Sequence, residues 1–226
     1  MRTLFHMPLD PACRMVRIAL AEKGLPAQLV ETRPWEDDGT LVAANPAGTV
    51  PVLIDEPPTR GSINVAPAMV IIEYIEDAYT AAPLYPSTSA ARAEVRRLCA
   101  WFTQKFEDEV ITLIIRERID KRLMRLGQPD YDLLKQGGEA LSWHMDYFNW
   151  LLDQRTWFAG EKYTAADIAA AAYISCVDYV DAAPWEKFPL VKDWYARVKS
   201  RPSMRPILRD RIAGLPPPRH YDDPDF

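Results

Sequence analysis

A change of pattern near residue 80 limits the fold of this chain more than any other feature. Upstream of it, runs typical of short strands alternate with segments whose apolar residues recur at helical spacing. Downstream of it, helical spacing continues to about residue 210, without a strand pattern. The sequence therefore predicts a small α/β domain followed by an all-helical domain.

The first part is predicted to contain a strand, a helix and a strand, and then two strands and a helix. Apolar residues at Val16, Ala19 and Leu20 define the first helix, and Gly24 ends it. The segments that we assign are strands at 2–6, 28–32 and 50–54 and helices at 13–23 and 67–79.

Helices are expected in the second part at residues 88–126, 130–155, 164–181, 189–200 and 203–211. Thr164 and Asp167 match a variant of the capping box at the start of one of them. Three consecutive prolines later force an extended chain, and the residues after them hold too little apolar surface to fold alone. The expected organisation is a first domain at 1–80, a linker at 81–87, a helical domain at 88–214 and a tail at 215–226.

The composition, with 48% hydrophobic and 26% charged residues, is that of a globular protein. A net charge of −5 argues against general affinity for nucleic acids. Cys13, Cys99 and Cys176 fit neither a disulfide framework nor a zinc pattern, which indicates a reducing compartment. The three histidines lie at no metal-ligand spacing, so we expect no metal site. Without a leader or an integral membrane segment in the sequence, we expect a cytoplasmic protein.

Four segments, in their order and spacing, resemble the glutathione-transferase superfamily over nearly the whole chain. They are PLDPACRMVRIALAEKG, NPAGTVPVL at Asn45–Leu53, YTAADIAAA at Tyr163–Ala171 and FPLVKDWYARVKSRPSM at Phe188–Met204. The resemblance implies the fold of that superfamily, a thioredoxin-like α/β domain joined to an all-helical domain. It also implies a cis peptide bond between Val50 and Pro51, where the backbone can meet a peptide ligand edge-on.

Enzymes of this superfamily lower the thiol pKa of glutathione with a Tyr, Ser or Cys near the start of the first helix. The resemblance places that role on Asp10, Pro11 and Ala12, none of which offers a hydroxyl or a thiol. An ionised Asp10 would raise the pKa of a nearby thiol, the reverse of what catalysis needs. Cys13 is displaced by one residue and is interpreted as a small core residue. We therefore expect no catalytic residue.

Family members also bind the glutamyl carboxylate of glutathione with an acidic residue and a Ser at the start of the third helix. Pro67 and Ala68 stand there instead, which removes a backbone N–H and a hydroxyl. Pro67 also suits the first turn of a helix, and both interpretations can hold. Thr49 stands where many relatives carry a basic residue, so we expect glutathione binding to be weak or absent. The degenerate glutathione site is assigned to Asp10, Val50, Pro51, Pro67 and Ala68.

A run of ten residues beginning at Arg116 carries five basic and two acidic side chains. On a helix, Arg116 would lie one turn from Asp120, so part of this charge would be paired within the run. Arg118, Arg122 and Arg125 would share a face and stay unpaired there. The run is either an ordinary solvated face or a contact surface, for which arginine is favoured.

The tail places Tyr221 and Phe226 among several aspartates, with a free carboxylate at Phe226. Such a segment is either a linear binding motif with aromatic anchors or a disordered or self-docked terminus. Trp35, in a loop of the first domain, is either an exposed aromatic anchor or a core residue.

A degenerate chain with this ending resembles those superfamily members that bind FtsZ filaments in alphaproteobacterial cell division. The resemblance implies a non-catalytic homodimer that binds the FtsZ polymer at midcell and promotes curved and bundled filaments. The residues expected to bind the partner are Trp35, Arg116, Asp120, Arg125, Asp223, Asp225 and Phe226. Two alternatives stay open: a glutathione-dependent transferase of a divergent class, and a protein that sequesters a small molecule in its interdomain cleft.

Overall fold

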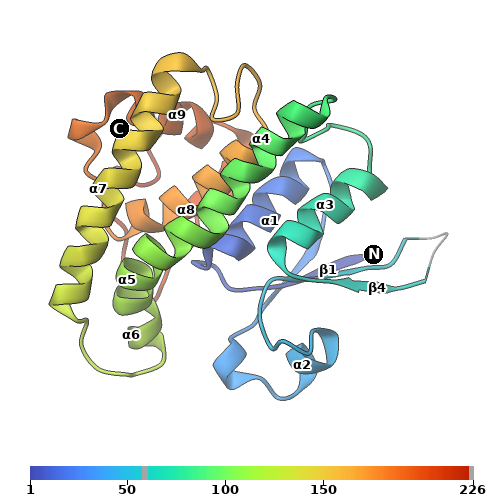
Figure 1. Ribbon diagram of the computed structural model, residues 1–226. Coiled ribbons are helices and arrows are strands. Elements are labelled where there is room, and N and C mark those ends of the chain that lie inside the picture. The colour runs from blue at the N-terminus through green and yellow to red at the C-terminus, as the bar shows by residue number, and fades with distance from the viewer. Residues whose placement is uncertain (58–60, 224–226) are drawn as a thin grey trace.

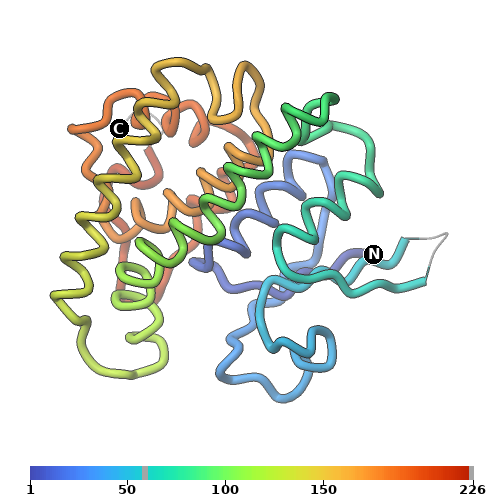
Figure 2. The backbone as a smooth tube through the Cα atoms, in the orientation of Figure 1, coloured from blue at the N-terminus to red at the C-terminus, as the bar shows by residue number. Residues whose placement is uncertain are grey.

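The computed structural model describes residues 1–57 and 61–223, and Figures 1 and 2 show a sheet-containing part beside a larger helical part. The sheet has four strands in the order β2-β1-β3-β4. Their bounds are Arg2–His6 (β1), Gln28–Glu31 (β2), Val52–Asp55 (β3) and Ile63–Val65 (β4). β1 pairs with β2 in parallel and with β3 antiparallel, and β4 pairs antiparallel with β3. This is the thioredoxin-like arrangement that the resemblance implied.

Helices cover both faces of the sheet unequally. The long helices α1 (Pro11–Glu22) and α3 (Ala68–Ala78) lie together on one face, and the short α2 (Thr40–Ala44) lies below the other, next to the 3₁₀ turn η1 (Pro34–Glu36). Under α2, Phe5, Leu41 and Val52 form a small core of their own. The remaining buried apolar residues of this part join the main core of the protein.

The helical part is built on one long helix and six shorter segments after it. The long helix runs without a break through α4 (Ser89–Ala100), η2 (Trp101–Ile111), α5 (Thr112–Ile115), η3 (Arg116–Asp120) and α6 (Lys121–Leu123), with η2 and η3 in the wider π-helical geometry. The later helices and 3₁₀ turns are α7 (Tyr131–Gln154), α8 (Ala165–Tyr179), η4 (Trp185–Lys187), α9 (Pro189–Lys199), η5 (Pro202–Met204) and α10 (Arg205–Leu208).

Helix α8 lies at the centre of the protein, and every one of its residues is buried. Its start is the expected capping box: the Thr164 side chain accepts from the backbone of the first turn, and Asp167 accepts from Thr164 N at 3.0 Å. Asp167 also accepts from Phe158 N and from Trp194 Nε1. Burial raises the pKa of Asp167 to about 6, and these donors oppose the shift. The capping box is therefore structural.

The sheet part and the helical part meet where α1 packs on α8. Arg14 of α1 is fully buried and donates to Ser175 Oγ of α8 at 2.8 Å. Arg14 and Arg17 both also contact the Asp210 carboxylate, at 3.2 and 2.8 Å. Two cations from the first helix therefore hold a carboxylate from the end of the helical part.

The structure corrects several expected boundaries. The first helix begins at Pro11 instead of residue 13, because Asp10 caps it, and the third strand begins at Val52 instead of residue 50. Pro67 is the residue before α3, not part of its first turn. The last expected helix, 203–211, is only the 3₁₀ turn η5 followed by one turn, Arg205–Leu208. In the described residues, all helices are too short or too polar to cross a bilayer.

Candidate functional site

A cavity of about 260 Å³ lies between the two parts and brings together five of the binding-site and partner-site residues that we assigned from the sequence. We call it the interdomain cleft. The loop before α1 supplies Asp10, and the segments around η1 and the third strand supply Trp35 and Val50. Arg116 and Asp120 line it from η3. The lining residues do not include Pro51, Pro67, Ala68, Arg125 or Asp223, and Asp225 and Phe226 lie outside the described residues.

Asp10 is the N-cap of α1, and its Oδ1 accepts from Cys13 N at 2.7 Å. Burial raises the pKa of Asp10 to about 6, with smaller contributions from the carboxylates of Glu107 and Asp120 across the cleft. At pH 7 this side chain therefore carries a negative charge at the position where family enzymes activate a thiol. It has no proton to donate to a thiolate there, and it disfavours one.

Cys13 cannot replace the missing group in this conformation. Its side chain is fully buried, and its Sγ accepts from Met7 N at 3.3 Å. Burial, followed by the charge of Asp10, raises the pKa of the Cys13 thiol well above its usual value. Cys13 is a core residue, as interpreted from the sequence.

The Val50–Pro51 peptide bond is cis, as the resemblance implied, and so is the bond between Ala66 and Pro67. At the start of α3, Pro67 makes no side-chain cap and the following Ala68 is buried. The glutamyl carboxylate of glutathione would find no hydroxyl there. The Thr49 carbonyl is already bonded by Asn45 Nδ2 at 2.9 Å.

The helical wall of the cleft differs from expectation. Arg116 does not pair with Asp120, and its Nη2 lies 2.8 Å from Glu107 Oε1, nine residues earlier in the long helix. Burial raises the pKa of Asp120 to about 6, with Arg116 opposing and Glu107 adding to the shift. Glu107 was missed because its place in the cleft depends on the wider turns of η2, which the sequence did not reveal. The cleft therefore holds three carboxylates and one arginine that is already paired.

Trp35 is half-buried in the wall of the cleft. Its Nε1 is buried and has no hydrogen-bond partner among the described residues. The ring is therefore neither a fully exposed anchor nor a core residue, and both interpretations from the sequence were incomplete.

The arginines expected to be unpaired on one helix face are not equivalent. Arg118 Nη1 donates to the Val180 carbonyl at 2.6 Å, and Arg122 Nη2 donates to the Gly214 carbonyl at 3.0 Å. Arg125 lies beyond the end of α6, exposed and with φ +57°, so it does not continue that face. The arginine run contacts the C-terminal segment. The sequence did not reveal this contact, because the two segments are far apart along the chain.

The tail docks on the helical part as far as it is described. Tyr221 is fully buried, with its ring edge-on to Tyr179 at a centroid distance of 5.2 Å. Lys199 Nζ donates to the His220 carbonyl at 2.7 Å, and His220 Nε2 lies 3.0 Å from Asp178 Oδ1. Of the alternatives left open for the tail, self-docking holds up to Asp223. The signal for it was Tyr221, the first of the two aromatic residues after the prolines.

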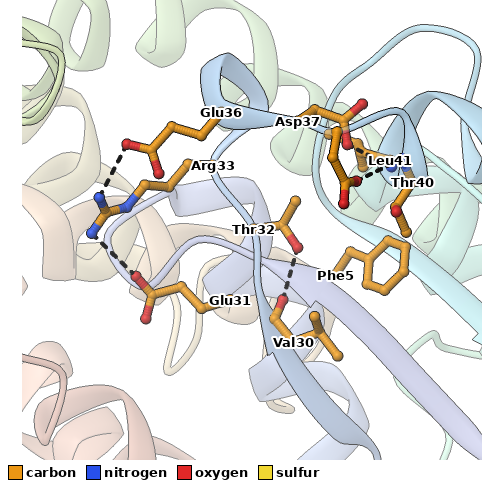
Figure 3. Close-up of a pocket in the computed structure, with 10 residues that line it drawn as sticks. Phe5, Val30, Glu31, Thr32, Arg33, Glu36, Asp37, Thr40 and Leu41 are labelled. Carbon is orange, nitrogen blue, oxygen red and sulfur yellow. Dashed lines mark hydrogen bonds and ion pairs between the residues drawn. The ribbon is translucent and has the colours of Figure 1, made fainter.

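A second cavity, of about 430 Å³, lies in the first domain beside β2 and α2 (Figure 3). Figure 3 shows Arg33 between Glu31 and Glu36, at 3.8 and 3.3 Å. Asp37 accepts from Leu41 N at 2.8 Å and so caps α2. These charges hold the local loop together. Among the described residues, no group of three or more His, Cys, Asp or Glu side chains is placed to hold a metal ion.

Comparison with known proteins decides the family. The N-terminal domain of glutathione S-transferases matches residues 4–83, and the C-terminal domain matches residues 119–202. The chain belongs to the glutathione S-transferase family. Within it, the chain is 46% identical to the FtsZ-localized protein A of Caulobacter vibrioides (strain NA1000 / CB15N) over 225 residues, which are 100% of this chain and 98% of that protein.

Solved structures of this family agree. The structure of FzlA from C. crescentus superimposes with a TM-score of 0.96 at 46% identity, covering 100% of this chain and 99% of that one. A glutathione S-transferase from Rhodospirillum rubrum F11 gives 0.95 at 44% identity, with both chains fully covered. These similarities confirm the fold that the sequence predicted.

Proposed function

We propose that this glutathione S-transferase family member is a non-catalytic homodimer that binds FtsZ polymers at midcell and promotes their curvature and bundling. The observation that carries the proposal is the full-length similarity to an FtsZ-localized protein. The cleft supports it, because Asp10 occupies the position of the thiol-activating residue and Cys13 is buried with a raised pKa.

Co-sedimentation with FtsZ and GTP tests the proposal. The protein should pellet with FtsZ polymers at micromolar concentration and stay in the supernatant with GDP. Charge reversal of the exposed Arg125 should weaken pelleting, whereas reversal of the exposed Lys135 on α7 serves as the matched control. A wild-type protein that remains in the supernatant with polymerised FtsZ contradicts the proposal. A fluorescent fusion should form a midcell band.

The proposed homodimer is supported by an exposed aromatic strip. Trp143 and Trp150, seven residues apart on α7, share a face and are 52% and 55% exposed. Trp101 stacks on Trp143, and Tyr147 stacks on Trp150. Such rings are typical of interface cores. The double variant Trp143→Ala/Trp150→Ala should sediment as a monomer in analytical ultracentrifugation, and Tyr131→Ala, which removes an 80% exposed ring from the same helix, should not.

A glutathione-dependent transferase is the alternative that family membership favours. It predicts turnover of chlorodinitrobenzene with glutathione at a rate typical of the family, and thermal stabilisation by millimolar glutathione. We expect neither, because in the cleft a glutathione thiolate would lie near Asp10 and would find the only arginine of that wall paired with Glu107.

A further inference from the structure

We infer that the C-terminal prolines and the arginine run together form a binding groove for an extended acidic peptide. The groove has a volume of about 250 Å³. Its floor and walls are the end of α8 at Tyr179 and Val180, the segment Leu215–Pro218, and Arg118. We call it the proline groove. It combines two features that lie outside the interdomain cleft, Arg118 of the arginine run and the prolines at 216–218.

The walls of the proline groove are fixed by specific bonds. Tyr179 OH accepts from Ile212 N at 2.8 Å and donates to the Leu215 carbonyl at 2.8 Å. Arg122 lies against Gly214, which has φ +72°, and a Cβ built there would come within 2.5 Å of Arg122 Nη2. Only glycine fits this contact without displacing the guanidinium. The proline wall is therefore preorganised, which lowers the entropy cost of binding.

The charge around the proline groove is positive although the chain carries −5 overall. Arg118 lines the groove, Arg122 donates to the carbonyl of Gly214 next to Leu215, and Arg219 directly follows Pro218. These three arginines form no ion pair among the described residues, and Arg118 donates to the Val180 carbonyl. The carboxylate on the rim is Asp181. Carbonyls satisfy arginine donors without neutralising the charge, so a carboxylate ligand would gain charge-assisted bonds.

The proline wall also restricts the mode of binding. Prolines have no N–H, so a ligand strand cannot extend a sheet along Pro216–Pro218. The wall offers carbonyls and apolar rings beside Leu215 and Val180. An extended segment in which carboxylates flank aliphatic side chains fits both features. If the proposed function holds, FtsZ would supply such a segment. Only the identity of the partner depends on the proposed function; the inferred groove itself does not.

Fluorescence anisotropy with a labelled decapeptide of alternating Glu and Leu tests the groove. We expect saturable binding that weakens as salt rises, and a decapeptide of alternating Lys and Leu should not bind. Arg122→Glu/Arg219→Glu should weaken binding about tenfold or more. Arg205→Glu is the matched control, because Arg205 is exposed on α10, outside the groove. Arg219→Glu alone, at an exposed residue, keeps the test valid if the Arg122 change unfolds the protein.

Equal binding by the wild type and both groove variants would overturn the inference, as would no binding of the acidic peptide or tighter binding of oligothymidylate. FtsZ co-sedimentation is measured separately with the same variants. A wild type that binds the peptide but fails to pellet with FtsZ contradicts the proposed function and leaves the groove in place. A wild type that pellets but does not bind the peptide contradicts the groove alone.

Discussion

The interdomain cleft and the proline groove share one helical segment, η3 to α6, but carry opposite charge. In the cleft, Asp10, Glu107 and Asp120 surround a single arginine, which is already paired. At the groove, Arg118 lies in the lining with the exposed Asp181, and both Arg118 and the adjacent Arg122 donate to backbone carbonyls. The run at residues 116–125, which the sequence presents as one charged helix face, therefore contributes to two separate surfaces, the interdomain cleft and the proline groove.

This difference in charge indicates that the proline groove, and not the interdomain cleft, is the more favourable site for an anionic ligand. Three carboxylates around one paired arginine make the cleft unfavourable for an anionic tripeptide, which is why we expect glutathione binding to be weak or absent. At the groove, Arg118 and Arg122 form no ion pair among the described residues, although Asp181 lies on the rim. The C-terminal segment makes this possible, so the comparison depends on how firmly that segment is attached.

The largest expected effect concerns that attachment. Asp210→Ala would leave the fully buried Arg14 and its neighbour Arg17 without their carboxylate. Removing one partner of a buried pair costs about 3–5 kcal/mol, so the variant should unfold at much lower urea concentration. Asp222→Ala, which breaks the half-exposed pair with Arg211, is the control and should cost less than about 1 kcal/mol. Equal losses would mean that the C-terminal wall is not part of the folded core.

Tyr221→Ala tests the second attachment. The ring is fully buried against Tyr179, and truncation of a large aromatic side chain costs about 3 kcal/mol or more. Chemical denaturation followed by circular dichroism should show this loss, whereas Tyr131→Ala, at an 80% exposed ring, should change stability by less than about 0.5 kcal/mol. A neutral Tyr221→Ala would show that the tail is only loosely placed.

A substitution in the interdomain cleft should instead raise the stability of the protein. Asp10→Asn keeps an oxygen for Cys13 N but removes a charge that burial disfavours. At pH 7 Asp10 is ionised in both states and only the folded state carries the penalty, so the variant should be about 1–2 kcal/mol more stable. The gain should shrink as pH falls through 6 and vanish below about 4, where both states are protonated. Urea denaturation at several pH values measures it. A variant that is less stable at pH 7 would show that the negative charge serves the fold.

The smallest effect is expected at His220. Its hydrogen bond to Asp178 raises the pKa of His220 above its usual value. That stabilisation is fully present below about pH 6.5 and is lost as pH rises through the folded pKa. His220→Gln should therefore lose less than about 1 kcal/mol near pH 5.5 and still less near pH 8. Lys199, whose pKa burial lowers to about 8, faces the same carboxylate and is present in both proteins. A difference in the free energy of unfolding between the wild type and His220→Gln that grows with pH would contradict this prediction.

Much of the fold was predictable, because strand and helix periodicities in the sequence are local signals. The capping box at Thr164 followed from a short motif, and the cis bond at Pro51 followed from the family resemblance. Arg116 was assigned the wrong partner, because the π-helical turns of η2 and η3 change which side chains meet, and helical spacing assumes regular turns. The contact between Arg122 and Gly214 spans 92 residues and has no local signal.

The ties of Asp210 to Arg14 and Arg17 also bear on synthesis. Arg14 receives its carboxylate from a residue 196 positions later in the chain. Burying an arginine without a counter-charge costs several kcal/mol, so a nascent thioredoxin-like domain should keep this helix open to water while it emerges. The packing of α1 is then completed only after Asp210 has been synthesised.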